Sequence, residues 1–116
     1  MATIEDIRTV CNQYIASVAA GDYDTVASLY AANATVEDPV GSDAHVGRDA
    51  IHAFYKSVAG DGMTAEMIGK VQVIGSTASF HFKIIVDGNS IVEPIDVMTF
   101  DDDGKITSMK AYWSFD

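Results

Sequence analysis

The hydrophobic residues near the start of the chain recur with the period of a helix. Apolar side chains at three- and four-residue intervals form one stripe, which consists of Ile4, Ile7, Cys11, Tyr14 and Val18. Thr3 and Asp6 match a capping box at the beginning of this stripe, and Gly21 suits the residue that follows a helix. The pattern therefore predicts an amphipathic helix between Thr3 and Gly21.

Two further helices are predicted in the first half of the chain. A short one begins at Asp22 or Asp24, and its inward-facing residues are Val26, Leu29 and Tyr30. The other covers Arg48 to Ala59 and ends at Gly60-Asp61-Gly62. The apolar stripe of this last helix consists of Ile51, Phe54, Tyr55 and Val58.

The hydrophobic period changes to two in the second half of the chain, which predicts strands. One earlier strand, Ala34 to Asp38, stops at Pro39. From Thr64 onward the alternation continues, and one face of it carries Ala78, Phe80, Phe82, Ile84 and Val86. Asp87-Gly88 is a strong hairpin signal. The strands expected after it are Ile91 to Phe100 and, beyond a turn at Asp101 to Gly104, Lys105 to Phe115.

Helices followed by a long antiparallel meander predict the α+β class rather than alternating β-α-β units. The 116 residues suit one domain, residues 1–116. A strongly bent sheet wrapped around a helix encloses a one-ended pocket. Because 48% of the residues are hydrophobic, more apolar material is present than a plain shell requires, which is a first indication of a lined cavity.

Charge and cysteine content exclude several classes of protein. The formal net charge of −10 argues against nucleic-acid binding, which needs clustered Lys and Arg. No apolar run approaches the ~18 residues of a membrane-spanning helix, so no membrane partner is expected. Cys11 is the only cysteine, which excludes an intrachain disulfide and favours a reduced, cytoplasmic setting. His45, His52 and His81 lack metal-ligand spacing, so no metal site is predicted.

Asp96 stands in a row of apolar residues on one face of its strand. The row consists of Val92, Pro94, Asp96, Met98 and Phe100. Desolvation in such a row favours the neutral carboxyl, which is a hydrogen-bond donor, whereas a carboxylate only accepts. The opposite row of Ile91, Ile95 and Val97 is also apolar, so the sequence equally allows a solvent-facing Asp96.

Asp38 lies at the end of its strand, in phase with Ala34 and Val36 and just before a turn from Pro39 to Ser42. Reactive groups are commonly held at strand ends and in the loops after them. The alternative is an aspartate that merely initiates a turn before proline, which is the more frequent use of this dipeptide.

Tyr14 lies in the middle of the apolar stripe of the first helix. A buried tyrosine either packs as a large hydrophobe or finds a partner for its hydroxyl. Tyr30 and Tyr55 also lie on inward helical faces. Three inward tyrosines from separate helices are able to form a hydrogen-bonded chain, which would make Tyr14 a stronger donor.

Tyr14 occurs together with the segments Leu29-Tyr30-Ala31, Ala34-Thr35-Val36-Glu37-Asp38-Pro39-Val40-Gly41, Pro94-Ile95-Asp96 and Ala111-Tyr112-Trp113-Ser114. In this combination the chain resembles the bacterial ketosteroid isomerases from the first helix to the last strand. The resemblance implies the nuclear-transport-factor-2-like cone. In that fold three N-terminal helices pack in the concave face of a strongly curved, mostly antiparallel sheet. One of these segments alone would be weak evidence for the family, because the cone fold hosts many functions.

The resemblance implies an enzyme that moves the double bond of a 3-oxo-Δ5-steroid into conjugation. Asp38 is similar to the general base that takes the C4 proton and returns it to C6. Tyr14 and a protonated Asp96 are similar to the two donors that hold the dienolate oxygen. A carboxylic acid kept neutral by an apolar site is the known arrangement in this family, so the neutral state of Asp96 is taken from the resemblance. Because one carboxylate moves the proton, no cofactor is implied.

The resemblance also implies supporting groups and a partner. Tyr30 and Tyr55 match supporting tyrosines, and Trp113 is expected to touch or hydrogen-bond Asp38. The residues expected to line the steroid cavity are Val18, Phe54, Phe82, Met109 and Trp113. Members of the family pair through the outer face of the sheet, so a homodimer is expected.

Two other interpretations stay open. A polyketide cyclase-like enzyme of the same fold would also use an acid/base aspartate on an apolar polycyclic substrate, and a non-catalytic steroid- or lipid-binding protein would have the same cone. Tyr14, Asp38 and Asp96 favour isomerisation because together they supply one base and two donors. An epoxide hydrolase of this fold needs an Asp-Arg-Asp set, which Arg48 does not obviously supply.

Overall fold

The computed structural model describes residues 2–58 and 62–114. The helices are α1 (Ile4–Ala20), α2 (Tyr23–Ser28) and α3 (Arg48–Val58). The strands are β1 (Tyr30–Glu37), β2 (His45–Val46), β3 (Met63–Ile74), β4 (Thr77–Val86), β5 (Asn89–Val92), β6 (Ile95–Phe100) and β7 (Ile106–Tyr112). The helices precede the long run of strands, as the sequence predicts, and the fold class is α+β.

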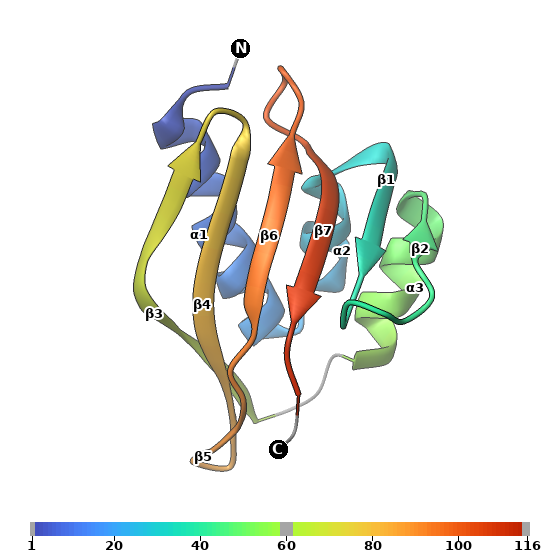
Figure 1. Ribbon diagram of the computed structural model, residues 1–116. Helices are drawn as coiled ribbons and strands as arrows, with labels where there is room; N and C mark the ends of the chain where they lie inside the picture. Colours follow the sequence, from blue (N-terminus) through green and yellow to red (C-terminus); the bar gives the residue numbers. More distant parts are fainter. Residues whose placement is uncertain (1, 59–61, 115–116) are drawn as a thin grey trace.

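The strands form one curved sheet with the order β2-β1-β7-β6-β4-β3, and β5 pairs with β4 (Figure 1). All neighbouring pairs are antiparallel except β1 and β7, which run parallel. The sheet is thus mostly antiparallel, as expected. The parallel pair brings the end of β1 beside the end of β7, although the two strands lie far apart in the sequence.

The three helices cover one face of this sheet, and Figure 1 views the molecule from the other face. α1 packs against β3 and β4, whereas α3 packs against β1, β2 and α2. The capping box at the start of α1 is present: Thr3 Oγ1 accepts from the Asp6 N–H, and the Asp6 side chain accepts from the Thr3 N–H. Gly21 ends α1 in a left-handed conformation, with φ of 69°.

The structure corrects several predicted elements. The strand predicted from Ala34 to Asp38 is β1, which begins at Tyr30 and ends at Glu37, just before Asp38. Tyr30 was predicted on the second helix, but α2 ends at Ser28 and Tyr30 begins β1. The strand predicted from Ile91 to Phe100 is two strands, β5 and β6, separated at Pro94, because proline has no N–H to donate to a ladder. The last strand, predicted from Lys105 to Phe115, is β7 and already ends at Tyr112; Trp113 and Ser114 are not part of it. The predicted helix end at Ala59 and the stop at Gly60 and Asp61 lie outside the described residues.

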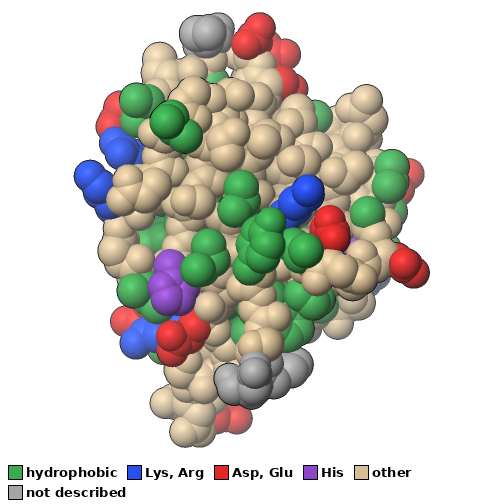
Figure 2. Space-filling view, viewed as in Figure 1, with side chains coloured by type: hydrophobic (Ala, Val, Ile, Leu, Met, Phe, Trp, Pro, Cys, Tyr) green, Lys and Arg blue, Asp and Glu red, His purple; other side chains and the backbone are tan. Residues whose placement is uncertain are grey.

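The two faces of the sheet differ in burial. The face toward the helices carries the core, in which Val36, Met98, Ile106 and Met109 are at most 1% exposed. The other face has large exposed hydrophobic side chains, among them Ile95 at 44% and Tyr112 at 48%. Figure 2 shows hydrophobic side chains gathered over the middle of this outer face, with charged groups beside them.

Candidate active site

A cavity of about 390 Å³ lies between the helices and the concave face of the sheet. This volume falls in the range of small-molecule sites. Three of its lining residues are the ones that the sequence singles out: Tyr14 from α1, Asp38 from the end of β1, and Asp96 from β6. The rest of the lining is mostly apolar and consists of Val18, Pro39, Phe54, Tyr55, Val58, Met63, Phe82, Ile84, Val92, Pro94, Ala111 and Trp113.

Asp96 is on the buried row of β6, which decides between the two orientations that the sequence allows. It is 1% exposed, and its cross-strand neighbours are Phe80 of β4 and Ala111 of β7. Neither oxygen of its carboxyl has a hydrogen-bond partner within the described residues. Burial, and then the nearby charge of Asp38, raise the pKa of Asp96 well above its usual range, and the Tyr14 hydroxyl offsets only part of this rise. Burial and the Asp38 charge both favour the neutral carboxyl, which is able to donate a hydrogen bond.

The three tyrosines form the predicted chain, with Tyr55 in the middle. The Tyr14 and Tyr55 hydroxyls are 3.0 Å apart, and those of Tyr55 and Tyr30 are 2.6 Å apart. They come from α1, α3 and β1 rather than from three helices. Burial is the main cause that raises the pKa of each phenol well above 10, so all three stay protonated. If Tyr14 donates into the cavity, its oxygen is left to accept from Tyr55.

Asp38 lies just beyond β1 and is held by Trp113, as the resemblance implies. The Trp113 Nε1–H donates to Asp38 Oδ1 at 2.6 Å. The other oxygen, Oδ2, accepts no hydrogen bond from the described residues. Burial raises the pKa of Asp38, while the Trp113 bond and the charge of His45 lower it. The alternative that Asp38 merely initiates a turn does not describe all of its surroundings, because Asp38 also lines the cavity.

The two aspartates thus have different environments in one cavity. Asp38 accepts a 2.6 Å hydrogen bond from Trp113 that favours its ionised form, whereas Asp96 is 1% exposed and its burial, the largest effect on its pKa, favours the neutral form. An ionised carboxylate is able to remove a proton, and a neutral carboxyl beside a tyrosine is able to stabilise a forming oxyanion. This arrangement fits proton transfer next to a carbonyl group.

Four of the five residues expected to line a steroid cavity lie in the wall of this one. Val18, Phe54, Phe82 and Trp113 line the cavity, but Met109 does not. Met109 is 1% exposed within the core, and β7 reaches the cavity wall two residues later, at Ala111. The sequence alone did not show this, because Met109 and Ala111 lie on the same face of one strand and only the position of the helices decides which of them meets open space.

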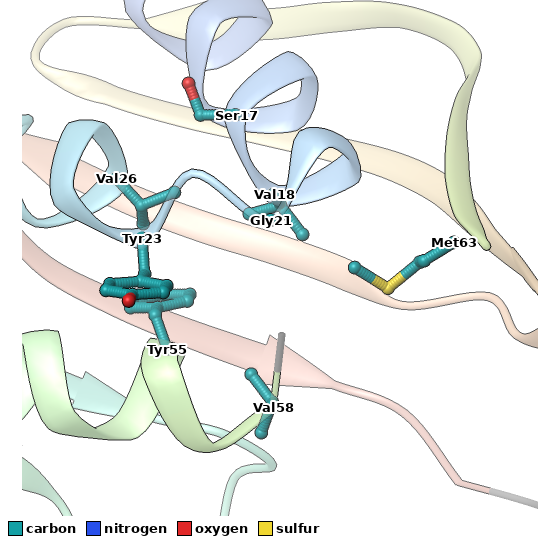
Figure 3. A pocket seen from close by; sticks show the side chains of 8 residues that line it. All are labelled: Ser17, Val18, Gly21, Tyr23, Val26, Tyr55, Val58 and Met63. Atoms are coloured by element: carbon teal, nitrogen blue, oxygen red, sulfur yellow. The ribbon is translucent and has the colours of Figure 1, made fainter. Parts of the chain in front are cut away.

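A second, smaller cleft of about 20 Å³ adjoins the cavity at the ends of the three helices, where there is room for roughly one water molecule (Figure 3). The two spaces share Val18, Tyr55, Val58 and Met63. The cleft has no carboxylate in its lining, so the reactive groups belong to the larger cavity.

Other polar groups that the sequence offers lie away from the cavity lining. Arg48 donates through Nη2 to the Tyr30 carbonyl oxygen at 2.5 Å, and it does not complete an Asp-Arg-Asp set in the cavity. His52 pairs with Asp24 at 2.6 Å on the surface of α2 and α3. Among residues 2–58 and 62–114, no group of His, Cys, Asp and Glu is arranged to hold a metal ion, and no helix is long and apolar enough to cross a membrane.

Known proteins resemble the chain in sequence and in fold. The SnoaL-like domain family matches residues 11–109. A steroid Delta-isomerase from Nocardioides simplex is 43% identical over a match of 112 residues that covers 94% of this chain and 90% of that protein. Among solved structures, an epoxide hydrolase/cyclase-like enzyme with a role in pyran ring formation in the polyether salinomycin has a TM-score of 0.83 and 29% identity. That match covers 98% of this chain and 95% of the other.

These matches extend over nearly the whole chain, and they include the strands and helices that carry Tyr14, Asp38 and Asp96. The chain therefore belongs to the SnoaL-like domain family and, within it, to the ketosteroid isomerases.

Proposed function

We propose that the protein is a steroid Δ-isomerase that moves the double bond of a 3-oxo-Δ5-steroid into conjugation with the 3-oxo group. The observation that carries this proposal is that Asp38, Tyr14 and Asp96 line one apolar cavity, in which burial raises the pKa of Tyr14 and Asp96 and so favours their protonated, donating forms. The identity to the steroid Delta-isomerase of Nocardioides simplex supports the same substrate class.

Asp38 acts first as a base and then as an acid. Its carboxylate takes the proton from C4, and the electron pair of the broken C–H bond forms the dienolate, whose negative charge rests on the C3 oxygen. The same carboxyl then returns the proton to C6, so the double bond ends in conjugation and no atom is gained or lost. Trp113 holds Oδ1 at 2.6 Å, which leaves Oδ2 to carry the proton.

Tyr14 and Asp96 stabilise the dienolate through hydrogen bonds to its oxygen. Donors that are already oriented toward the developing charge are typically worth a few kcal/mol each in the transition state. Tyr55 and Tyr30 support Tyr14, since the three hydroxyls each lie within hydrogen-bond distance of the next, and a bond donated by Tyr55 would leave the Tyr14 proton for the substrate oxygen. The apolar walls keep water away from the site and so keep these interactions strong.

The structural similarity to an epoxide hydrolase/cyclase-like enzyme gives ring formation as a second candidate function. A steroid- or lipid-binding protein is the non-catalytic candidate. The isomerase is favoured over both because Tyr14, Asp38 and Asp96 line one cavity and together supply one base and two donors, and because the chain is 43% identical to a steroid Delta-isomerase.

The test is an assay with 5-androstene-3,17-dione, in which turnover produces the ultraviolet absorbance of the conjugated enone. Asp38→Asn is expected to lose roughly 10²- to 10⁴-fold in turnover, the usual contribution of a general base, while it still binds the steroid. No turnover by the wild-type protein would reject the isomerase and favour the binding protein. An equal loss of binding and turnover in Asp38→Asn would make Asp38 a structural residue.

We also propose that the protein is a homodimer that pairs through the outer face of the sheet, and that it works in the cytoplasm. Ile68, His81, Ile95 and Tyr112 are successive cross-strand neighbours on this face, across β3, β4, β6 and β7. The three apolar members are 37–48% exposed. A row in which three of four members are exposed apolar side chains favours a protein contact.

Sedimentation velocity tests the proposed dimer. Ile95→Lys is expected to give monomers, because it places a charge in the centre of the row. Ile74→Lys, which changes an exposed residue outside the row, is expected to leave the dimer intact. Monomeric wild-type protein at micromolar concentration would contradict the proposal.

A further inference from the structure

The turn after Asp38 is fastened to its surroundings by backbone hydrogen bonds. β1 ends at Glu37, whose register partner in β7 is Lys110. Beyond it, the Val40 N–H donates to the Ala111 carbonyl oxygen at 2.8 Å. The Ser42 N–H and hydroxyl both donate to the Pro39 carbonyl oxygen, at 3.1 and 2.6 Å. These bonds hold the chain beyond Asp38, where the β1–β7 pairing has ended.

Glu37 adds one side-chain hydrogen bond, which joins the chain before Asp38 to the chain after it. Its Oε1 accepts from the Gly41 N–H at 2.8 Å, so the residue before Asp38 is joined to the residue three positions after it. Gly41 has φ of 99°, a conformation that L side chains rarely adopt. A carboxylate acceptor makes this a charge-assisted bond, which is stronger than one between neutral groups.

Glu37 itself does not touch the reacting groups. Alternation along an extended strand places neighbouring side chains on opposite sides. The cavity lining accordingly includes Asp38 and Pro39, but not Glu37. Any influence of Glu37 on the reaction therefore passes through the backbone of the turn.

We propose that Glu37 is a positioning residue for the isomerisation: its hydrogen bond to Gly41 fixes the turn, so that the Asp38 carboxylate reaches both carbons of the substrate. The inference rests on the proposed isomerase function. One carboxylate serves C4 and then C6, so an error in its position slows two proton transfers. Trp113 orients the side chain of Asp38 through Oδ1, and Glu37 holds the backbone that carries it.

The experiment compares three variants in the 5-androstene-3,17-dione assay. Glu37→Ala removes the acceptor, Glu37→Gln keeps an oxygen that accepts from Gly41, and Asp43→Ala removes a carboxylate from the same turn region. Asp43 is the matched control because it is exposed and makes no hydrogen bond within the described part of the chain. Its removal changes the local charge by the same amount as Glu37→Ala.

Glu37→Ala is expected to lower kcat by roughly 5- to 20-fold, a fraction of the ~10²-fold that a 1 Å misplacement costs. KM is expected to stay within about twofold, because the apolar lining that binds the steroid is unchanged. With substrate deuterated at C4, the isotope effect on kcat is expected to rise, since proton abstraction becomes more strongly rate-limiting. Glu37→Gln is expected to restore most of the activity, and Asp43→Ala to match the wild type.

The inference is overturned if Glu37→Ala keeps the kcat and isotope effect of the wild type, or if Glu37→Gln is as impaired as Glu37→Ala. It is also overturned if Asp43→Ala is impaired to the same extent, because the effect would then be one of charge. Far-ultraviolet circular dichroism and the unfolding midpoint of each variant identify a loss caused by misfolding, and a kcat loss confined to a misfolded Glu37→Ala likewise overturns the inference. If the wild-type protein shows no turnover, the proposed function itself is rejected, and this inference is rejected with it.

Discussion

Asp96→Asn tests the neutral state of the buried carboxyl without any measurement of activity. Asp96 is 1% exposed, lies between Phe80 and Ala111, and has no hydrogen-bond partner within the described residues. Burial and the Asp38 charge raise its pKa well above the ordinary value of 3.8. Between these two pKa values, the folded protein keeps a proton that the unfolded chain has released.

The sign and size of the effect follow from this difference in bound protons. The wild-type protein loses stability as the pH rises through the window, because the unfolded state binds fewer protons than the folded state. One proton corresponds to a slope of about 1.4 kcal/mol per pH unit. Asparagine does not titrate, so the free energy of unfolding of Asp96→Asn should rise relative to the wild type by this amount per pH unit, until the pH reaches the raised pKa. The fixed cost of burying an amide cancels in the slope.

The assay is guanidinium chloride unfolding of both proteins between pH 5 and pH 8, at one protein concentration so that dimerisation does not enter the comparison. Asp22→Asn is the control. Hydrogen bonds from Thr25 lower the pKa of Asp22, so Asp22 is ionised in both the folded and the unfolded protein above pH 5. The difference in unfolding free energy between Asp22→Asn and the wild type should therefore not change between pH 5 and pH 8. A flat difference for Asp96→Asn, or one that favours the wild type as the pH rises, would show an ionised Asp96 and refute the assignment of this residue as a donor.

Three further results are expected. Trp113→Phe removes the hydrogen bond that lowers the pKa of Asp38, so the acid limb of the pH profile of kcat/KM should move to higher pH. An unshifted acid limb would show that Trp113 does not influence the pKa of the catalytic base. Tyr55→Phe should reduce turnover by roughly 3- to 10-fold, as expected for the loss of a hydrogen bond of about 1 kcal/mol to Tyr14, and Tyr23→Phe outside the chain should not. Burial raises the pKa of Cys11 to about 12, so a thiol reagent at pH 8 should react with the unfolded protein but hardly with the folded one; rapid labelling of folded protein would contradict the burial.

Much of the fold could be read from periodicity. Local interactions determine both ends of α1, the N-cap at Thr3 and the C-cap at Gly21. A capping box and a left-handed glycine each act within a few residues. Tyr30 was misassigned for the opposite reason. Its helical spacing from Val26 is a local signal, but pairing of Tyr30 with Ile106 of the distant β7 places it in a strand.

The candidate site divides in the same way. The identities of Tyr14, Asp38 and Asp96 are visible in the sequence because each is a polar group at a position where the pattern expects an apolar one. The order of the tyrosine chain, the exclusion of Met109 from the cavity and the bond from Gly41 to Glu37 are not visible there. The first two depend on where separate elements meet, and the third depends on the conformation of the turn after Asp38.

The sequence by itself determined the α+β class and the helical and strand periods, because these are properties of spacing and side-chain type. It also marked Tyr14, Asp38 and Asp96 as candidates, whose roles came from the resemblance to the ketosteroid isomerases. Only the tertiary structure decided that Asp96 faces the core rather than solvent, since both rows of its strand are apolar and the choice depends on which face of the sheet the helices cover. It also decided that Asp38 and Asp96 share one cavity with different surroundings, Trp113 beside one and carbon around the other. Solvation and distance set the protonation of a carboxyl, and both come from residues that the chain brings together only when it folds.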